Sequence, residues 1–342
     1  MTGFIFTWIE KLAPNLDKLY VICQERGDTS GLPGNVEVYS FGKEKGYGKF
    51  RQGYKLFIIS YQLARKADGF FVHMHPIYAI IAWLPAKFYG KKIVLWYTHK
   101  SVDFKLRFAH FLVDKVLTAS RESFRLPSNK VKVVGHGIDL GKFIPSPSPL
   151  PALPAGRPPG ERDRNRRRGV FNILSIGRIS PVKDYETLIK AAEILYHDRG
   201  VKDIEIQIYG RVGLPKHQTY LDSLIQFVHN ADLEGIVKFQ GELNYEYVDE
   251  VYQEADLFVN LSQTGSIDKT ALEAAACKTL VLTSNEAFEK PFKTTSPLLF
   301  FERDNPKDLA EKISIIKSLP PAESEEIGKK LKDAFMLAVG AS

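Results

Sequence analysis

The chain has 342 residues, enough for two domains of ordinary size. Its 44% hydrophobic and 25% charged residues are typical of a globular protein, and no apolar run approaches the roughly 20 residues that span a bilayer. Two cysteines, Cys23 and Cys277, exclude a disulfide framework. The first residues lack the basic region and cleavage site of a secretory signal, so we expect a cytoplasmic protein.

The net charge of +7 is unevenly distributed. Residues 1–145 carry a net +11, residues 146–169 a net +4 and residues 170–342 a net −8. A basic first half favours an anionic partner, such as a membrane surface or an anionic acceptor. The alternative is solvated surface charge with no partner. No nucleic-acid-binding motif is present, so nucleic acid is not expected as a partner.

The first half of the chain alternates short apolar runs with longer amphipathic segments. We expect strands at 19–23, 36–40, 69–73, 92–97, 115–119 and 131–134. Helices are expected at 4–12, 49–66, 77–89 and 104–112. Strands that alternate with helices favour βαβ units and a parallel sheet.

Residues 145–169 interrupt this alternation, because they are rich in proline and then in arginine and have no apolar periodicity. We interpret them as a linker between a first domain, 1–144, and a second domain, 170–342. In the second domain strands are expected at 171–176, 204–209, 237–240, 257–260 and 280–283. Helices are expected there at 185–196, 217–229, 247–253 and 269–277. Ligands in such sheets bind beyond the carboxyl ends of the strands, and we expect a cleft between the domains.

The first candidate site follows the strand at 171–176. The strand breaks at Gly177, and the loop after it carries Arg178 and Lys183 before a helix begins near Asp184. Glycine allows the backbone to approach a ligand, and the start of a helix attracts anions. Two cations on this loop are suited to a diphosphate.

The second candidate site follows the strand at 257–260. A polar loop that includes Gly265 and Ser266 leads into a helix that carries Glu273. Backbone N–H groups of such a loop can contact phosphate, and a carboxylate on the helix can accept hydrogen bonds from sugar hydroxyls. Asp268 has a simpler interpretation as the N-cap of this helix.

Together these segments resemble the donor-binding half of retaining glycosyltransferases of family 4, the group 1 type. The resemblance rests on Arg178 and Lys183 in GRISPVKDYETLI and on Glu273 in TALEAAACKTLVLTSN. The first half agrees through FVHMHP, LWYTHK and VVGHGID, which resemble strand ends of that family's acceptor domain. The match covers most of the chain outside the linker.

The resemblance implies a GT-B fold, with two Rossmann-like α/β domains that face a cleft, and sugar transfer with retention of anomeric configuration, usually without metal. It implies that Arg178 and Lys183 hold the diphosphate and stabilise the leaving group. Glu273 would bind the ribose, and His99 would contact the transferred sugar and the reacting centre. The remaining residues expected to bind or border the donor are Gly177, Gly210, Arg211, Gly265, Ser266, Asp268 and Lys269.

Each of these residues also has an ordinary structural interpretation. His99 could be a capped or core histidine, Lys183 a solubilising residue at a helix start, and Glu273 a solvated helix acid. His73 and His75 alternate on one strand, but too few further ligands accompany them for a metal site, and no metal or cofactor is expected. His136 is assigned to the crossover between the domains.

The sequence departs from the family pattern in three places. Gly265 stands where the family has the first of two glutamates eight positions apart. Backbone N–H groups at 265 and 266, or the Asp268 carboxylate, could take over its contact with the donor sugar. The chain also opens with a helix where the family has a buried strand, and its tail ends early. We therefore expect a fragment that lacks the first strand of its first domain.

The leading hypothesis is a glycosyltransferase for a surface polysaccharide or glycolipid, peripheral at the inner face of the membrane. Its basic first domain would contact anionic lipid through residues 77–92 or 104–111. A non-catalytic or fragmentary nucleotide-sugar-binding scaffold is the alternative, and another GT-B enzyme such as a sugar-nucleotide epimerase is a third. A nicotinamide dehydrogenase is not expected, because no GxGxxG follows a strand.

Overall fold

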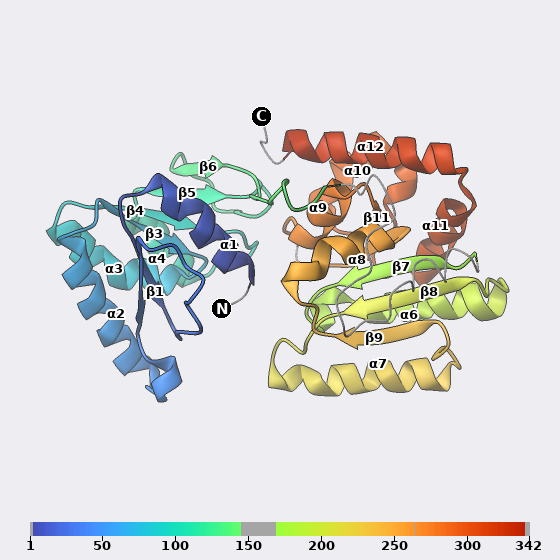
Figure 1. The fold of residues 1–342 in the computed structure, drawn as a ribbon, viewed down its shortest axis with the longest axis horizontal. Coiled ribbons are helices and arrows are strands. Elements are labelled where there is room, and N and C mark those ends of the chain that lie inside the picture. The colour runs from blue at the N-terminus through green and yellow to red at the C-terminus, as the bar shows by residue number, and fades with distance from the viewer. Residues whose placement is uncertain (1–2, 145–168, 264, 339–342) are drawn as a thin grey trace. The chain divides into compact units, whose positions relative to one another are not determined.

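The computed structural model describes residues 3–144, 169–263 and 265–338, and it divides into two units, 1–134 and 135–342 (Figure 1). Each unit is an α/β structure in which all paired strands are parallel. The α/β class predicted from the alternating pattern is confirmed. Along the described parts of the chain, no helix is both long and apolar enough to cross a membrane.

The first unit contains two separate parallel sheets. Strands β1 (Leu19–Cys23) and β2 (Val36–Ser40) form one, and β3 (Gly69–His73), β4 (Lys92–Trp96), β5 (Lys115–Thr118) and β6 (Val131–Val133) form the other in sequence order. Helix α1 (Gly3–Leu12) precedes them, and its Trp8 packs edge-on against His73 and Trp96. No strand among the described residues joins β1 to β3.

Three helices form a layer against the strands of the first unit. They are α2 (Lys49–Ala64), α3 (Pro76–Phe88) and α4 (Phe104–Leu112). Parallel strands joined by right-handed crossovers place such helices on one face, and α3 packs against both of its neighbours. Their inner faces bury small and aliphatic residues, among them Leu56, Ile59, Ala79, Ala82, Ala86, Leu106 and Ala109.

The second unit has one five-stranded sheet in the order β11-β10-β7-β8-β9. Its strands are β7 (Phe171–Ile176), β8 (Ile204–Tyr209), β9 (Val237–Gly241), β10 (Leu257–Asn260) and β11 (Leu280–Thr283). The helices around it are α6 (Tyr185–Glu193), α7 (Gln218–Asn230), α8 (Val248–Glu254), α9 (Lys269–Ala276), α10 (Glu289–Thr295), α11 (Pro306–Ser318) and α12 (Pro321–Ala338). Strands β10 and β11 are nearly continuous apolar runs that are buried along their whole length, as expected for strands covered on both faces, whereas β8 alternates apolar and polar residues.

The structure divides into its two units after residue 134, ten residues before the end of the predicted first domain at residue 144. The segment before the expected linker packs into the second unit, because Phe143 is buried in its core and the Lys142 Nζ donates to the Tyr245 carbonyl at 2.6 Å. Residues 145–168 of the predicted linker lie outside the described residues.

The strands and helices of the predicted pattern are confirmed to within one or two residues, with one exception. The helix expected at 185–196 is α6 followed by a five-residue π-helix, Ile194–Asp198. In addition, α10, α11 and α12 were not among the predicted elements; α12 begins at Pro321 and packs against α9 and α10 of the second unit.

Candidate active site

The two loops predicted to bind a ligand follow strands that are neighbours in the sheet. The chain runs from β7 outward to β8 and β9, and then returns to place β10 on the other side of β7. The β7–β10 pair is therefore the point where the strand order reverses, which is where open parallel sheets bind ligands. Residues 177–184 follow β7, and residues 261–268 follow β10.

The loop after β7 is compact because two backbones meet there. The N–H of Gly177 donates to the Tyr209 carbonyl at 2.9 Å, and the Tyr185 hydroxyl donates to the Gly177 carbonyl at 2.9 Å. A Cβ at Gly210 would overlap that same Gly177 carbonyl oxygen. Gly210 therefore acts by permitting close packing of the loops after β7 and β8.

Arg178 lies on the exposed side of this loop. Its side chain passes over Gly213, where a Cβ would lie 3.2 Å from the Arg178 Cδ. The neighbouring Ile179 N–H donates to the Arg211 carbonyl at 2.9 Å, which joins this loop to the one after β8. The Arg211 guanidinium lies 3.7 Å from the Glu242 carboxylate on the surface. Arg178 is thus an exposed cation at the carboxyl end of β7, whereas Arg211 lies near a carboxylate.

Lys183 joins the two candidate loops. It ends a short 3-10 helix, Pro181–Lys183, and its ammonium forms an ion pair with the Asp268 carboxylate, with both side chains only 16% exposed. Asn260, the last residue of β10, donates from its Nδ2 to the same carboxylate oxygen at 3.1 Å. A backbone bond from the Gln263 N–H to the Val182 carbonyl, 3.0 Å, adds a second link between the loops.

The interpretation of Asp268 as a capping side chain is wrong. Asp268 occupies the N-cap position of α9, but its side chain caps no backbone N–H of the helix. Burial alone would raise the pKa of Asp268, yet the Lys183 ammonium and the Asn260 amide hold that pKa below its ordinary value. Asp268 is therefore a carboxylate committed to orienting Lys183.

Gly265 and Ser266 form the turn before α9. Gly265 has a φ of +61°, a left-handed conformation that glycine adopts without strain, and it is buried. The Ser266 carbonyl accepts a hydrogen bond from the Asn285 Nδ2 at 2.8 Å. The glycine at this position is thus consistent with the backbone conformation of the turn, which disfavours a glutamate.

Glu273 is buried within α9 and is not a solvated helix acid. Its side chain is 5% exposed, and its Oε2 accepts a hydrogen bond from the Tyr252 hydroxyl at 3.0 Å. Burial raises the pKa of Glu273 to about 7, against the opposing effects of Tyr252 and Lys269. Burial also lowers the pKa of Lys269, one turn earlier in the helix. Such a perturbed buried acid is typical of a functional site.

Sequence reasoning missed the polar residues that support these loops. Asn260, Thr283 and Asn285 are all buried, and the Thr283 hydroxyl donates to the Asn260 Oδ1 at 3.1 Å. They stand at the carboxyl ends of β10 and β11, so polar residues that end apolar strands were the available signal.

The four histidines singled out in the sequence, His73, His75, His99 and His136, lie in three environments. His99 is exposed in the loop after β4, where its Nδ1 accepts a hydrogen bond from the Ser101 N–H at 3.1 Å. His73 and His75 contact aromatic rings, and no group of three or more potential metal ligands occurs among the described residues. His136, assigned to a crossover, is buried in the second unit, and burial together with Lys269 lowers its pKa to about 4. It is a neighbour of the candidate site that the sequence did not indicate.

The fold has close counterparts among solved structures. Alr3699/HepE of Anabaena, solved with UDP and glucose, superposes with a TM-score of 0.75 over 99% of this chain and 94% of that chain, at 17% identity. A sucrose-phosphate synthase from Thermosynechococcus elongatus gives a TM-score of 0.75 over 98% of this chain and 88% of that chain, at 14% identity. The architecture is that of the GT-B fold, as predicted.

Sequence comparison identifies the family. Residues 161–333, slightly more than half of the chain, match the glycosyl transferases group 1. The protein belongs to this family, as the motifs around Arg178, Lys183 and Glu273 indicated.

The curated relatives align with only part of this chain, and the aligned segment is also only part of their own length. A D-inositol 3-phosphate glycosyltransferase of Paenarthrobacter aurescens is 31% identical over 172 residues, 49% of this chain and 41% of that protein. A mannosylfructose-phosphate synthase of Agrobacterium fabrum is 26% identical over 161 residues, 46% of this chain and 33% of that protein. The matched segment thus spans less than half the length of these relatives.

Proposed function

We propose that this protein is a retaining glycosyltransferase. In this proposal it transfers a sugar from a nucleotide-diphosphate sugar to a glycan or lipid-linked acceptor in surface polysaccharide or glycolipid synthesis. The observation that carries the proposal is the junction of the two loops at the β7–β10 switch point, where the Lys183–Asp268 pair joins the loop that carries Arg178 to the loop that carries Gly265. Membership of the family and relatives named glycosyltransferases support it.

The role proposed for Lys183 is compatible with its ion pair. An ammonium has three donors, so one can remain on Asp268 while another binds a phosphate oxygen. Arg178, exposed on the same loop, supplies the second cation. Together they would neutralise the charge that develops on the nucleotide diphosphate as it leaves, which is the largest contribution expected in such a transfer.

The donor sugar and ribose would be bound by the loop after β10 and by α9. Backbone N–H groups at Gly265 and Ser266 take the place of the missing glutamate in this proposal, because Asp268 is already committed to Lys183. Glu273 would accept hydrogen bonds from the ribose hydroxyls. The role of His99 in contacting the transferred sugar stays a prediction from the family resemblance.

The test is calorimetric titration of the purified chain with UDP-, GDP- and ADP-sugars. We expect saturable binding of one nucleotide class, strongly weakened in Arg178→Ala and in Lys183→Ala. Lys190→Ala is the matched control, since Lys190 is an exposed lysine on α6 that pairs with Glu186 at 2.6 Å. No binding by a folded chain would contradict the proposal.

A nucleotide-sugar-binding scaffold is the second candidate, and Gly265 is the observation that favours it. Screening for sugar transfer with the nucleotide class found by calorimetry separates the two. Binding with product whose anomeric configuration matches the donor supports the retaining enzyme. Binding without turnover on any glycan or lipid-linked acceptor supports the scaffold.

We also propose that the protein works in the cytoplasm, peripherally at the inner face of the membrane. The basic character of the first unit and a lipid-linked acceptor support this placement.

A further inference from the structure

Each helix of the α2–α4 layer exposes an aromatic or aliphatic stripe on the side opposite its buried face. Phe50 is 97% exposed on α2, Phe88 is 70% exposed on α3 and Phe104 is 80% exposed on α4. Their spacing is helical, three, four or seven residues apart. The exposed members are Phe50, Tyr54 and Tyr61 on α2, Ile77, Leu84 and Phe88 on α3, and Phe104, Phe108 and Phe111 on α4.

The stripes belong to one surface because the helices are packed side by side. The rings of Tyr61 and Phe88 lie 5.8 Å apart across α2 and α3, and α4 packs against α3 on its other side. Within α4, Phe104 stacks on Phe108 with 6.2 Å between centroids. The buried core of this unit is made by other residues of the same helices. Folding therefore does not account for these exposed rings, and such a patch indicates an interaction surface.

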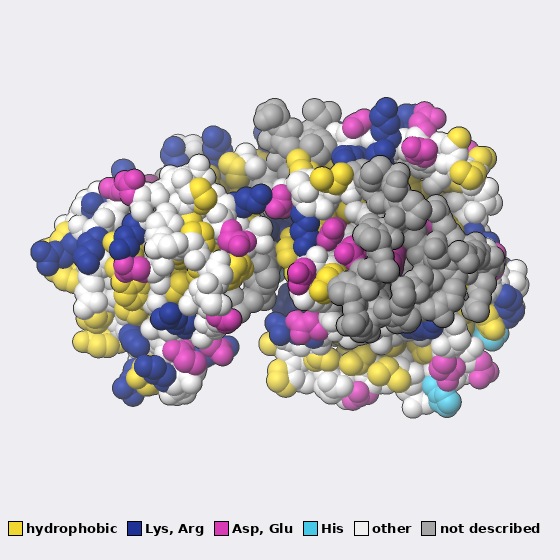
Figure 2. All heavy atoms as spheres, in the orientation of Figure 1, with side chains coloured by type: hydrophobic (Ala, Val, Ile, Leu, Met, Phe, Trp, Pro, Cys, Tyr) yellow, Lys and Arg dark blue, Asp and Glu magenta, His cyan; other side chains and the backbone are white. Residues whose placement is uncertain are grey.

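The helices of this layer and the residues that end them carry charge of a single sign. Residues 49–66, 76–92 and 104–112 contain no aspartate or glutamate. They contain ten cations: Lys49, Arg51, Lys55, Arg65, Lys66, Lys87, Lys91, Lys92, Lys105 and Arg107. Figure 2 shows Lys and Arg side chains next to hydrophobic ones over the α2 and α3 region of this unit. Aromatic side chains interleaved with cations match the chemistry of an anionic lipid surface.

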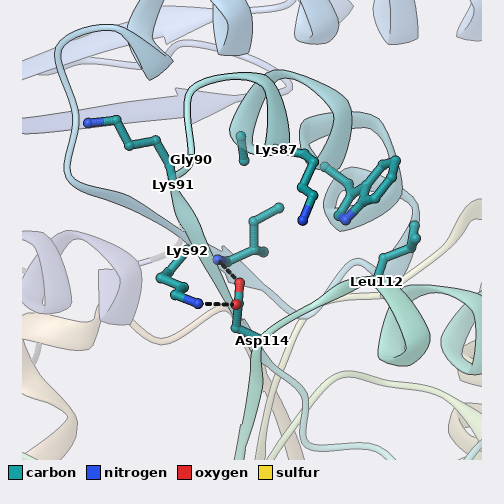
Figure 3. Close-up of a pocket in the computed structure, with 9 residues that line it drawn as sticks. Lys87, Gly90, Lys91, Lys92, Leu112 and Asp114 are labelled. Atoms are coloured by element: carbon teal, nitrogen blue, oxygen red, sulfur yellow. Dashed lines mark hydrogen bonds and ion pairs between the residues drawn. The ribbon is translucent and has the colours of Figure 1, made fainter.

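A small pocket of about 160 Å³ lies at the end of α3, lined in part by Trp83, Lys87, Leu112 and Asp114. Asp114 is fixed at its base by the Ile93 N–H at 2.8 Å and the Lys92 ammonium at 2.9 Å. Lys87 points into the pocket, whereas Lys91 extends away from it (Figure 3). Three lysines, Lys87, Lys91 and Lys92, line this pocket, so it adds to the basic character of the end of α3.

We propose that the outward face of α2, α3 and α4 is a docking surface for a bilayer that contains anionic phospholipid. The rings enter the headgroup region while the lysines and arginines bind lipid phosphates. Symmetric pairing of this face with the same face of a second copy does not fit, because ten cations would meet ten cations. The inference rests on the proposed peripheral membrane placement and names the surface responsible, and it does not depend on sugar transfer.

The test is flotation of the full chain with vesicles of phosphatidylcholine alone and of phosphatidylcholine mixed with phosphatidylglycerol. We expect binding to the anionic vesicles, reduced at least tenfold in Phe50→Ser/Phe88→Ser/Phe104→Ser and at least tenfold in Lys87→Glu/Lys91→Glu. Lys92 is left intact because it holds Asp114. The substituted side chains are exposed, apart from Lys91, which is partly exposed. We therefore expect both variants to fold, and circular dichroism would verify this.

Matched controls come from the second unit. Ile225→Ser removes an exposed aliphatic residue on α7, and Lys190→Glu reverses an exposed charge on α6. We expect both to bind vesicles like the wild type. Equal binding by all variants would overturn the proposal, and so would loss in the lysine variant alone, which indicates plain electrostatic adsorption. Self-association that is lost in the aromatic variant, without vesicle binding, would overturn it in favour of a second copy.

Nucleotide-sugar titration of the same variants keeps the two proposals apart. The surface variants should retain donor affinity, because none of their residues lies in the candidate active site. A chain that binds vesicles but no nucleotide sugar contradicts only the enzymatic proposal. The reverse result contradicts the docking surface and the peripheral membrane placement, but not sugar transfer.

Discussion

The outer face of α2–α4 and the loops after β7 and β10 hold functional groups in opposite ways. On the helical face the rings and cations are exposed and point to solvent, each held by its own helix. At the loops the polar groups are few, buried and bonded to one another, from Thr283 through Asn260 and Asp268 to Lys183. Single substitutions should therefore strongly lower stability or nucleotide-sugar affinity at the loops, and change them little on the helical face.

Gly210→Ala should have the largest effect. A Cβ there would overlap the Gly177 carbonyl, so the loops after β7 and β8 must separate. We expect a loss of about 3 kcal/mol in the free energy of unfolding, measured by denaturant titration. Gly235→Ala is the control, because a Cβ at Gly235 would meet nothing within 4 Å. Equal stability of the two variants would show that the β7 loop is not held by close packing.

Lys183→Ala should weaken nucleotide-sugar binding about 100-fold, or about 2.7 kcal/mol. It removes a cation and leaves the buried Asp268 carboxylate facing the diphosphate. Asp268→Asn in the same chain should recover part of this loss, since the repulsion disappears. Calorimetry of the two single variants and the double variant measures the coupling. Additive effects would mean that the ion pair plays no part in donor binding.

The pH dependence of donor binding should report Glu273. Its pKa of about 7 means that it is protonated below that pH and cannot accept ribose hydroxyls with full charge. We expect affinity for a nucleotide sugar to fall several-fold from pH 8 to pH 6 in the wild type and to change little in Glu273→Gln. The same pH profile in both would exclude Glu273 as the titrating group.

The Glu273 carboxyl should also make the free energy of unfolding depend on pH. Because the folded pKa of Glu273 lies above its unfolded value, its contribution is fully present below about pH 4.5 and is lost as the pH rises to about 7. His136, with a lowered pKa, acts in the opposite direction as the pH falls from 6.5 to 4. The difference in unfolding free energy between the wild type and Glu273→Gln isolates the carboxyl group.

Asn285→Ala should have a moderate effect. It removes the hydrogen bond to the Ser266 carbonyl and leaves that buried acceptor without this donor. We expect a loss of about 1–2 kcal/mol in the free energy of unfolding and a few-fold weaker donor binding, by denaturation and calorimetry. A variant as stable as the wild type would show that the turn at 265–266 keeps its conformation without the Asn285 hydrogen bond.

Phe50→Ser alone should have the smallest effect. The ring is 97% exposed, so we expect the free energy of unfolding to change by no more than about 0.5 kcal/mol. A larger loss, in the same denaturation assay, would mean that the exposed face contributes to folding and would remove the contrast with the loops.

By itself the sequence determined the α/β alternation, the bounds of most strands and the two loops. Apolar runs, helical spacing and glycines are local signals, so β7 and β8 were predicted to the residue. Arg178, Lys183 and Glu273 were recognisable because they stand at fixed distances from such strands.

Only the tertiary structure decided which side chains meet. Asp268 is 85 positions from Lys183, and no local pattern shows that its carboxylate turns away from its own helix to pair with that lysine. Likewise each helix of the first unit shows an apolar stripe in sequence, but burial alone distinguishes the stripe that packs from the one that stays exposed. Long-range pairing and burial depend on how the strands are ordered in the sheet, and that order is not a property of any single segment.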